Sequence, residues 1–334
     1  MRKVTLIPGD GIGREITKSV QAIFAAAGAK IEWEVCNMGL ETYELSGTLI
    51  PQEFVDSMNH TGVALKGPTT TPIGGGHRSI NVTLRQMFNL YANVRPVRSI
   101  PGVNTRFDEI DMIIVRENTE DLYKGIEYKV GDRVAHGIKL ITADASERIG
   151  RHAFELAKKL GRQKVTAVHK ANIMKFTDGL FLESVRKVSA DYPSVQFAEI
   201  LVDNCCMQLV TKPQQFDIIV TENLYGDILS DLCAGLVGGL GIAGGANLGA
   251  TKAIFEAVHG SAPDIAGKNL ANPTALIMSG AMLLEHIDQT VIANRVRRAV
   301  VSTLAHAESR TKDLGGTLGT EEFTKAVIKN LANP

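Results

Sequence analysis

The chain has 334 residues, of which 44% are hydrophobic and 22% are charged, and its formal net charge is zero. This length allows one large domain or two ordinary domains of a soluble globular protein. A zero net charge provides no overall field for nucleic acid or an anionic membrane. Because no apolar run is long enough to span a bilayer, we expect neither a nucleic-acid nor a membrane partner.

The opening residues MRKVTLIPGD lack the apolar core of a signal peptide. The four cysteines show neither CxxC spacing nor an accompanying histidine pattern: Cys36, Cys205, Cys206 and Cys233. Reduced cytosolic thiols are therefore expected. We expect a cytoplasmic protein, or one of the mitochondrial matrix if the chain is the processed form of a eukaryotic protein.

The N-terminal region predicts a strand, a glycine turn and a helix. A β-branched run at residues 4–7 leads into PGDGIG, and apolar residues then recur at helical spacing up to Ile23. Arg14 occupies the position where the dinucleotide fingerprint of the Rossmann fold needs its third glycine. We therefore expect a tight turn here in preference to a phosphate-binding loop.

A glycine-rich loop, GGG, precedes a predicted amphipathic helix that begins near Ser79 and Asn81. Arg85 lies one helical turn after Asn81, and Arg95 follows directly before a proline, where the chain should be extended. Because arginine pairs with carboxylates through two parallel hydrogen bonds, this group suits a small molecule with several carboxylates. A surface helix with two solvated arginines explains the same residues equally well.

Further along the chain, short hydrophobic strands are predicted to be followed by charged residues. These residues are Lys66, Arg116, Lys170, Asp203 and Asp227. Strands that alternate with helices predict a largely parallel sheet, and open sheets of this kind bind ligands outside the carboxyl ends of their strands. The charged residues are therefore candidates for one site.

Residues 124–142 contain two runs of alternating polarity around Gly131 and Asp132. This pattern predicts a hairpin that projects from the body of the protein. Because the exposed edges of a hairpin need a partner, we expect exchange or pairing between subunits there.

Asp227 and Asp231 lie four residues apart in a predicted helix, so their carboxylates point the same way. Two hard oxygen ligands on one face suit Mg²⁺ or Mn²⁺, and Asp203 is a third candidate ligand. Two solvated aspartates near a helix start are the simpler alternative. With Lys170 and Tyr123 as proton-transfer groups, the whole set suits oxidation of a 2-hydroxy acid followed by metal-assisted loss of CO₂.

Several long motifs resemble those of the isocitrate and isopropylmalate dehydrogenases, the β-decarboxylating dehydrogenase family. In order they are PGDGIG, GGGHRSIN, LRQMFNLYANVRP, RENTED, VHKANIMK, NLYGDILSD and HGSAPDIAGKNLANP, and they cover essentially the whole chain. The resemblance implies an α/β fold with two domains, a largely parallel central sheet and a dimerisation arm, which is not a Rossmann fold. Residues 1–92 and 238–334 would form the large cofactor-binding domain, and residues 93–237 the small domain with its arm at about residues 124–142.

The resemblance also implies roles for matching residues. Arg85, Arg95 and Arg116 look like the arginines that bind the substrate carboxylates. Tyr123 resembles the proton donor to the enol intermediate. Lys170, contributed by the partner subunit, is similar to the residue that assists deprotonation of the substrate hydroxyl.

In the same way, Asp227 and Asp231 look like the metal ligands of one subunit, and Asp203 looks like that of the other. The metal, Mg²⁺ or Mn²⁺, would polarise the forming ketone. An active site shared between subunits implies a homo-oligomer that is at least a dimer.

Ser79 and Asn81 decide the expected substrate. They offer a hydroxyl and an amide that suit the third carboxylate of isocitrate, whereas an isopropyl group would leave their hydrogen bonds unmade. We expect oxidative decarboxylation of isocitrate to 2-oxoglutarate, a reaction of the tricarboxylic acid cycle. Homoisocitrate is the second choice and 3-isopropylmalate the third.

Asp264 and Ile265 decide the expected cofactor. NADP-dependent enzymes of the family carry a Lys-Tyr pair there, whereas an aspartate accepts hydrogen bonds from the ribose of NAD and repels a 2′-phosphate. We therefore expect NAD. The resemblance implies further cofactor contacts at Thr70, His259, Gly260 and Asn272.

A non-catalytic regulatory subunit is the alternative from a different class, because the mitochondrial NAD-dependent relatives include such chains. A regulatory chain is expected to have lost some catalytic residues. This chain keeps the tyrosine, the lysine, the three aspartates and the three arginines, so we expect a self-sufficient catalytic homo-oligomer.

Overall fold

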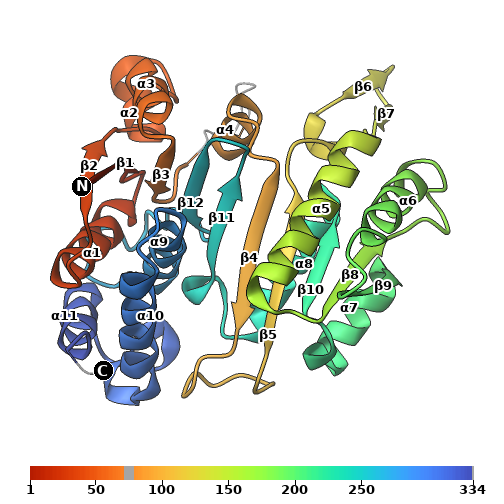
Figure 1. The fold of residues 1–334 in the computed structure, drawn as a ribbon. Helices are drawn as coiled ribbons and strands as arrows, with labels where there is room; N and C mark the ends of the chain where they lie inside the picture. The colour runs from red at the N-terminus through yellow and green to blue at the C-terminus, as the bar shows by residue number, and fades with distance from the viewer. Residues whose placement is uncertain (71–78, 333–334) are drawn as a thin grey trace.

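The computed structural model describes residues 1–70 and 79–332, along which strands and helices alternate (Figure 1). The strands are β1 (Arg2–Ile7), β2 (Ile31–Val35), β3 (Val63–Lys66), β4 (Ala92–Arg98), β5 (Asp111–Glu117), β6 (Glu127–Val130), β7 (Val134–Gly137), β8 (Lys164–His169), β9 (Gln196–Leu201), β10 (Ile218–Thr221), β11 (Gly244–Leu248) and β12 (Ala253–Ala257). The helices are α1 (Gly13–Ala26), α2 (Leu40–Ser46), α3 (Gln52–Thr61), α4 (Ile80–Met87), α5 (Ala143–Leu160), α6 (Thr177–Ser189), α7 (Val202–Thr211), α8 (Asn223–Leu236), α9 (Thr274–His286), α10 (Thr290–Ala305) and α11 (Thr320–Asn330). One short 3₁₀ turn, η1 (Asp121–Lys124), matters for the site. None of these helices is long and apolar enough to cross a membrane.

All strands except β6 and β7 join one ten-stranded sheet in the order β2-β1-β3-β12-β11-β4-β5-β10-β8-β9. Neighbours are parallel except where β11 meets β12 and β4, and where β4 meets β5. The predicted α/β fold with a largely parallel sheet is therefore confirmed. Strands from the predicted large domain fill one half of the sheet and strands from the predicted small domain fill the other, while the domain boundaries themselves stay a prediction.

One face of the sheet is apolar along its length. The cross-strand register places Leu65, Phe255, Ala246, Val94 and Val115 in one row across β3, β12, β11, β4 and β5. Helix α9 packs against one half of this face and α5 against the other, and both lie in front of the sheet in Figure 1. Because residues directly opposite each other share a face, this row is continuous core.

The opposite face is apolar only at its two ends. Side chains of α3 and α4 pack with the apolar residues of β1, β3 and β12, and side chains of α8 pack with those of β5. Between them the register sets a buried polar row: Lys66, Glu256, Asn247, Asn93 and Arg116. This polar row forms the floor of the candidate site.

Helix α4 is shorter than the sequence pattern predicts. It ends at Met87, because Asn89 adopts a left-handed φ of 47°. The amide of Leu90 donates to the carbonyl of Arg85 at 2.9 Å, and that of Asn89 to the carbonyl of Gln86 at 3.3 Å. This pair of bonds is a Schellman motif, which stops the helix and sends the chain into β4.

A second boundary was also predicted wrongly. Strand β9 ends at Leu201 and Val202 already belongs to α7, so Asp203 lies in the first turn of a helix. Lys66 and Arg116 are the last and the second-last residues of their strands rather than the residues that follow them. The hydrophobic runs nevertheless place each strand correctly.

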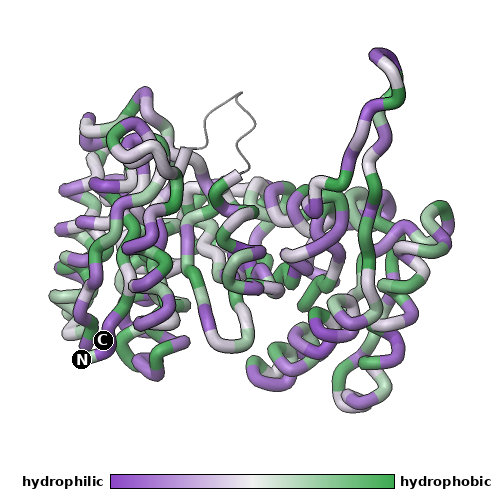
Figure 2. Tube along the Cα trace, turned by 90° about the horizontal axis from the view of Figure 1, so that it is seen from above, coloured by the Kyte–Doolittle hydropathy of each residue, from purple (hydrophilic) through white to green (hydrophobic). Residues whose placement is uncertain are grey.

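The predicted hairpin is confirmed. Strands β6 and β7 pair antiparallel, with Val130 opposite Val134 and Gly131 at the turn, and all their residues are exposed. Figures 1 and 2 show the hairpin projecting from the body of the molecule. Its expected pairing with another subunit stays a prediction.

Candidate active site

The floor of the candidate site is a buried ion pair. The Nζ atom of Lys66 lies 2.8 Å from a carboxylate oxygen of Glu256, and Asn247 donates to the other oxygen at 2.8 Å. Burial opposes ionisation of Glu256, but the charges of Lys66 and Arg85 outweigh it and lower the pKa of Glu256 to about 2. This carboxylate is therefore negative and fully committed to its neighbours.

Three buried arginines stand above this floor. Arg85 comes from α4, Arg95 from β4 and Arg116 from β5, so two strands and a helix converge on one point. Burial, and then the positive charge of Arg116, lower the pKa of Arg85 to about 10. The Nε atoms of Arg85 and Arg95 are buried and have no hydrogen-bond partner among the described residues. Since buried donors are normally satisfied, this arrangement is suited to an anionic ligand.

Two aspartates of α8 complete the cluster. One oxygen of Asp227 pairs with Arg116 and lies 3.9 Å from Arg95, and the hydroxyl of Tyr123 donates to its other oxygen. Asp231, one turn later, pairs with Arg95 at 3.0 Å. The structure thus brings together five of the predicted site residues.

The protonation states follow from these contacts. Burial opposes ionisation of Asp227, but Arg116 and the Tyr123 hydrogen bond outweigh it, so the pKa of Asp227 is lowered. Burial, followed by the hydrogen bond to Asp227, raises the pKa of Tyr123. At neutral pH the site therefore holds a carboxylate beside a protonated phenol, which can donate a proton.

Lys170 and Asp203 form a separate pair. The Nζ atom of Lys170, just after β8, lies 2.5 Å from Asp203 on α7, and the Asp203 side chain is 65% exposed. Within the described part of one chain, no hydrogen bond or ion pair links them to Tyr123 or Asp227. The chain thus presents two half-sites.

A divalent cation fits these half-sites only in part. Asp227 and Asp231 offer hard oxygen atoms on one helix face, the donor type that Mg²⁺ and Mn²⁺ prefer. Among the described residues of one chain, no third His, Cys, Asp or Glu joins them. The set becomes complete when Asp203 of a second copy supplies the missing carboxylate.

Ser79 and Asn81 lie at the start of α4, on the approach to the arginines. The Oδ1 atom of Asn81 is buried without a hydrogen-bond partner, whereas Ser79 is exposed. The GGG loop before them lies outside the described residues. The unpartnered amide of Asn81 is therefore a second polar group that is free to meet a ligand.

The predicted cofactor residues follow β12 and the turn after β3. The Nδ1 atom of His259 contacts the carbonyl of Gly260 at 3.0 Å, and its Nε2 atom is buried without a partner in the described structure. Burial lowers the pKa of His259, so the ring is neutral. Thr70 shares a hydrogen bond of 2.6 Å with Ser261, while Asp264 is exposed in the same loop. An unpartnered imidazole nitrogen beside an exposed carboxylate fits a nucleoside.

Two other cofactor predictions have different surroundings. Ile265 is partly buried and packs against the core. Asn272 donates to Asp313 at 2.9 Å and accepts from the amide of Thr274 at 3.0 Å. The side chain of Asn272 is thus already engaged within the protein.

The glycine turn PGDGIG serves packing, as expected. A Cβ atom on Gly9 would lie 2.1 Å from the carbonyl of Pro68, so only glycine fits there. The carboxylate of Asp10 accepts the amides of Thr70 at 2.6 Å and Leu40 at 3.0 Å. The turn therefore holds the Thr70 segment in place.

Three floor residues were not predicted from the sequence: Glu256, Asn247 and Asn93. A signal was present, since Glu256 interrupts the apolar strand β12. A charged residue in a fully buried strand requires a buried partner. That partner is Lys66, which the strand pattern had singled out.

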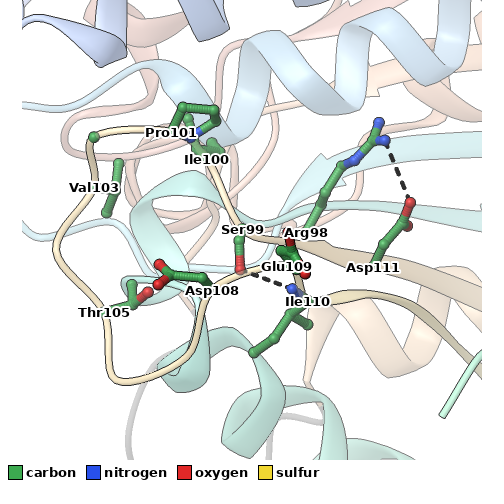
Figure 3. Close-up of a pocket in the computed structure, with 11 residues that line it drawn as sticks. Arg98, Ser99, Ile100, Pro101, Val103, Thr105, Asp108, Glu109, Ile110 and Asp111 are labelled. Carbon is green, nitrogen blue, oxygen red and sulfur yellow. Dashed lines mark hydrogen bonds and ion pairs between the residues drawn. The ribbon is translucent and has the colours of Figure 1, made fainter. Parts of the chain in front are cut away.

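A separate hollow of about 440 Å³ lies at the far end of the β4–β5 pair, lined by the loop of residues 98–111 (Figure 3). Arg98 pairs there with Asp111 at 3.3 Å, and the hydroxyl of Ser99 accepts the amide of Ile110 at 3.1 Å. It shares no lining residue with the candidate site.

Clustered cations, paired carboxylates and a protonated phenol at one sheet face define an enzyme that acts on a small polyanionic molecule. A family model described as isocitrate/isopropylmalate dehydrogenase matches residues 3–327. The chain therefore belongs to the isocitrate/isopropylmalate dehydrogenase family of oxidoreductases, as its motifs predict.

Relatives within the family carry different names. The chain is 52% identical to the mitochondrial catalytic subunit 5 of NAD isocitrate dehydrogenase from Arabidopsis thaliana, over 98% of this chain and 88% of the relative. It is 52% identical to a mitochondrial regulatory chain of NAD isocitrate dehydrogenase from Dictyostelium discoideum, over 99% and 92%. It is also 51% identical to a chloroplastic 3-isopropylmalate dehydrogenase from Solanum tuberosum, over 91% and 85%. A crystal structure of isocitrate dehydrogenase from Methylococcus capsulatus superposes with a TM-score of 0.96 at 50% identity, covering 99% of each chain.

Proposed function

We propose that the protein catalyses the oxidative decarboxylation of isocitrate to 2-oxoglutarate and CO₂ with reduction of NAD, assisted by Mg²⁺ or Mn²⁺. The observation that carries the proposal is the trio of buried arginines, two of which have unpartnered Nε atoms: Arg85, Arg95 and Arg116. Three converging guanidinium groups are costly to bury together, and a substrate with several carboxylates compensates that cost.

Asn81 supports isocitrate over its homologues. Its buried, unpartnered amide and the Ser79 hydroxyl can bind a third carboxylate, whereas an isopropyl group would leave both without partners. Homoisocitrate, one methylene longer, is the second candidate and 3-isopropylmalate the third. Overall identity does not separate them, because relatives named for different substrates match at 51% and 52%.

The chain's own residues account for the proton transfers. The partner subunit's Lys170 takes the hydroxyl proton while a hydride leaves C2 for the nicotinamide ring of NAD. The bond from C3 to its carboxylate then breaks, CO₂ leaves, and Tyr123 gives a proton to C3 of the resulting enol. Mg²⁺ or Mn²⁺, held by Asp227, Asp231 and the partner subunit's Asp203, supplies Lewis-acid polarisation when bound.

The NAD preference rests on Asp264. Its exposed carboxylate lies in the loop that follows His259, where it can accept ribose hydroxyls and repel a 2′-phosphate. The names of NAD-dependent relatives support the same choice. We place Thr70, Gly260, Ile265 and Asn272 around the same cofactor.

We propose a self-sufficient catalytic homo-oligomer, at least a dimer, whose two domains have the predicted boundaries. The alternative, a regulatory subunit, has a relative at the same identity as the catalytic one. Retention of Tyr123, Lys170 and the three aspartates favours the catalytic role. The mitochondrial names of the plant and slime-mould relatives support the matrix as location for a eukaryotic source.

Initial rates of nicotinamide reduction with Mg²⁺ test this proposal. Isocitrate, homoisocitrate and 3-isopropylmalate are each assayed with NAD and with NADP, and isocitrate with NAD should dominate. The variant Asn81→Leu should lower kcat/KM for isocitrate by about 10- to 100-fold, because a hydrogen bond to a charged group is lost. Gln86→Leu, which adds the same apolar side chain elsewhere on α4, should leave kcat/KM near that of the wild type. A dominant rate with another substrate would refute the assignment, and absence of turnover with every pair would favour the regulatory subunit.

A further inference from the structure

Asp121 has a conformation that needs explanation. Its φ is 70°, the left-handed region that residues other than glycine rarely adopt, and it is buried with 1% of its surface exposed. Such conformations persist only where the surrounding structure imposes them, and they concentrate at functional sites. Asp121 opens η1, the turn that carries Tyr123.

The carboxylate of Asp121 joins two elements. One oxygen accepts the amide of Leu122 at 2.7 Å within η1, and the other accepts the amide of Leu224 at 2.7 Å in the first turn of α8. The N-cap residue of α8, Glu222, makes no side-chain cap of its own. Asp121 therefore caps α8 from a distant segment, with its negative charge at the positive end of the helix.

The same two elements meet again at the candidate site. The Tyr123 hydroxyl on η1 donates to Asp227 on α8, one turn beyond Leu224. The Asp121 cap is thus a structural link beside the link that involves the reacting groups. The amide of Asp121 also donates to the carbonyl of Leu140 at 2.8 Å, which fixes the turn to the chain leaving the hairpin.

We propose that Asp121 is a positioning residue for the proton donor: it fixes η1 on α8 so that the Tyr123 hydroxyl is held beside Asp227 and faces C3 of the substrate. This inference rests on the proposed role of Tyr123. Asp121 touches neither substrate nor cofactor, and its effect on the reaction passes through Tyr123. The phenol gives its proton to C3 of the enol and recovers one from solvent.

The variant Asp121→Asn tests the link with little change of shape. Asparagine tolerates a left-handed φ, but its amide has one acceptor atom in place of two, so one of the two backbone bonds is lost. The matched control is Asp288→Asn, because Asp288 is also left-handed, with φ 61°, but is exposed after α9. Asp121→Gly removes the carboxylate without backbone strain and serves as the second variant.

Two rates separate positioning from general damage. By microscopic reversibility, the group that protonates C3 also removes that hydrogen again, so the enzyme should exchange one C3 hydrogen of 2-oxoglutarate. Exchange is followed by proton NMR in D₂O with Mg²⁺ and NADH, and hydride transfer by a single turnover of isocitrate with NAD. In Asp121→Asn and Asp121→Gly we expect exchange to fall by about 10- to 100-fold, with hydride transfer within about twofold, because only the proton donor is displaced.

The comparison with Tyr123→Phe decides the outcome. Tyr123→Phe should abolish exchange, and adding Asp121→Asn to it should lower the residual turnover no further, since both changes act on one step. If the two effects multiply, or if both rates fall together in the Asp121 variants, Asp121 is not a positioning residue for Tyr123. If Tyr123→Phe itself leaves exchange intact, the proposed role of Tyr123 fails instead.

Discussion

At the scale of single residues, the site is defined by charges that the sheet buries in register. Lys66, Glu256, Asn93 and Arg116 share one face because alternate residues of a strand point the same way. The arginines were predictable from sequence, since their spacing and the strand ends pointed to one site. Glu256 was not, because its partner lies 190 residues away and only the pairing of β3 with β12 brings them together.

Removing one member of the buried pair should be much worse than removing both. Glu256→Gln should destabilise the fold by about 3 to 5 kcal/mol, because it leaves the Lys66 charge buried and unpaired. The double variant, Lys66→Met with Glu256→Gln, should recover a large part of that loss. Urea unfolding midpoints measure both, and equal midpoints for the single and double variants would contradict the argument.

The same pair predicts a pH dependence. The folded pKa of Glu256 is about 2, below the ordinary value of 4.5, so its contribution to stability is complete above pH 4.5. It should disappear as the pH falls from about 4.5 toward about 2, since the folded protein must then take up a proton against Lys66 and Arg85. The wild type should therefore lose more stability over this range than Glu256→Gln does, as measured by urea unfolding at each pH.

At the scale of elements, the hydrophobic patterns located the strands and helices but not their ends. The apolar spacing of α4 continues past Met87 because Phe88 and Leu90 pack beside the chain turn, so periodicity alone could not reveal the stop. The signal was Asn89, a residue that tolerates a left-handed φ and commonly ends helices. The hairpin was clearer, since two alternating runs flank a glycine.

The helix stop yields a prediction. Asn89→Ala should destabilise the protein by about 1 to 2 kcal/mol, because alanine bears the full steric cost of a left-handed conformation. Asn89→Gly should leave stability unchanged or slightly raised, because glycine adopts this φ freely. Thermal unfolding of the two variants tests the motif. If alanine and glycine gave the same melting temperature, the backbone conformation of Asn89 would not be what stops α4.

At the scale of the whole molecule, the order of strands separates two halves that meet at β11 and β4. Tyr123 and Asp227 lie together near this junction, whereas Lys170 and Asp203 lie toward the β8–β9 edge. Sequence spacing could not predict this separation, because it depends on which strand lies at the edge. An exposed lysine–aspartate pair in one half-site and a tyrosine–aspartate pair in another suit two copies that complete each other.

The shared site predicts complementation between inactive variants. Tyr123→Phe and Lys170→Met should each lose nearly all turnover as pure proteins. In a mixed dimer, one site combines both defects and the other combines Tyr123 of one copy with Lys170 of the other, so it is intact. If the copies pair at random, half of the dimers are mixed and about one quarter of wild-type turnover should return. Co-expression with two different affinity tags and an isocitrate assay measures this recovery.

A second pair of variants provides the control. Tyr123→Phe and Asp227→Asn affect residues that hydrogen-bond within one chain, so each site of their mixed dimer carries one defect. Co-expression of these two should restore nothing, whereas the Tyr123 and Lys170 pair should recover. Recovery in both mixtures would mean that exchange or reversion, and not site sharing, restores turnover. Recovery in neither would place Lys170 in the same half-site as Tyr123, and the exposed Lys170–Asp203 pair would then have to move toward Asp227 within one chain before turnover.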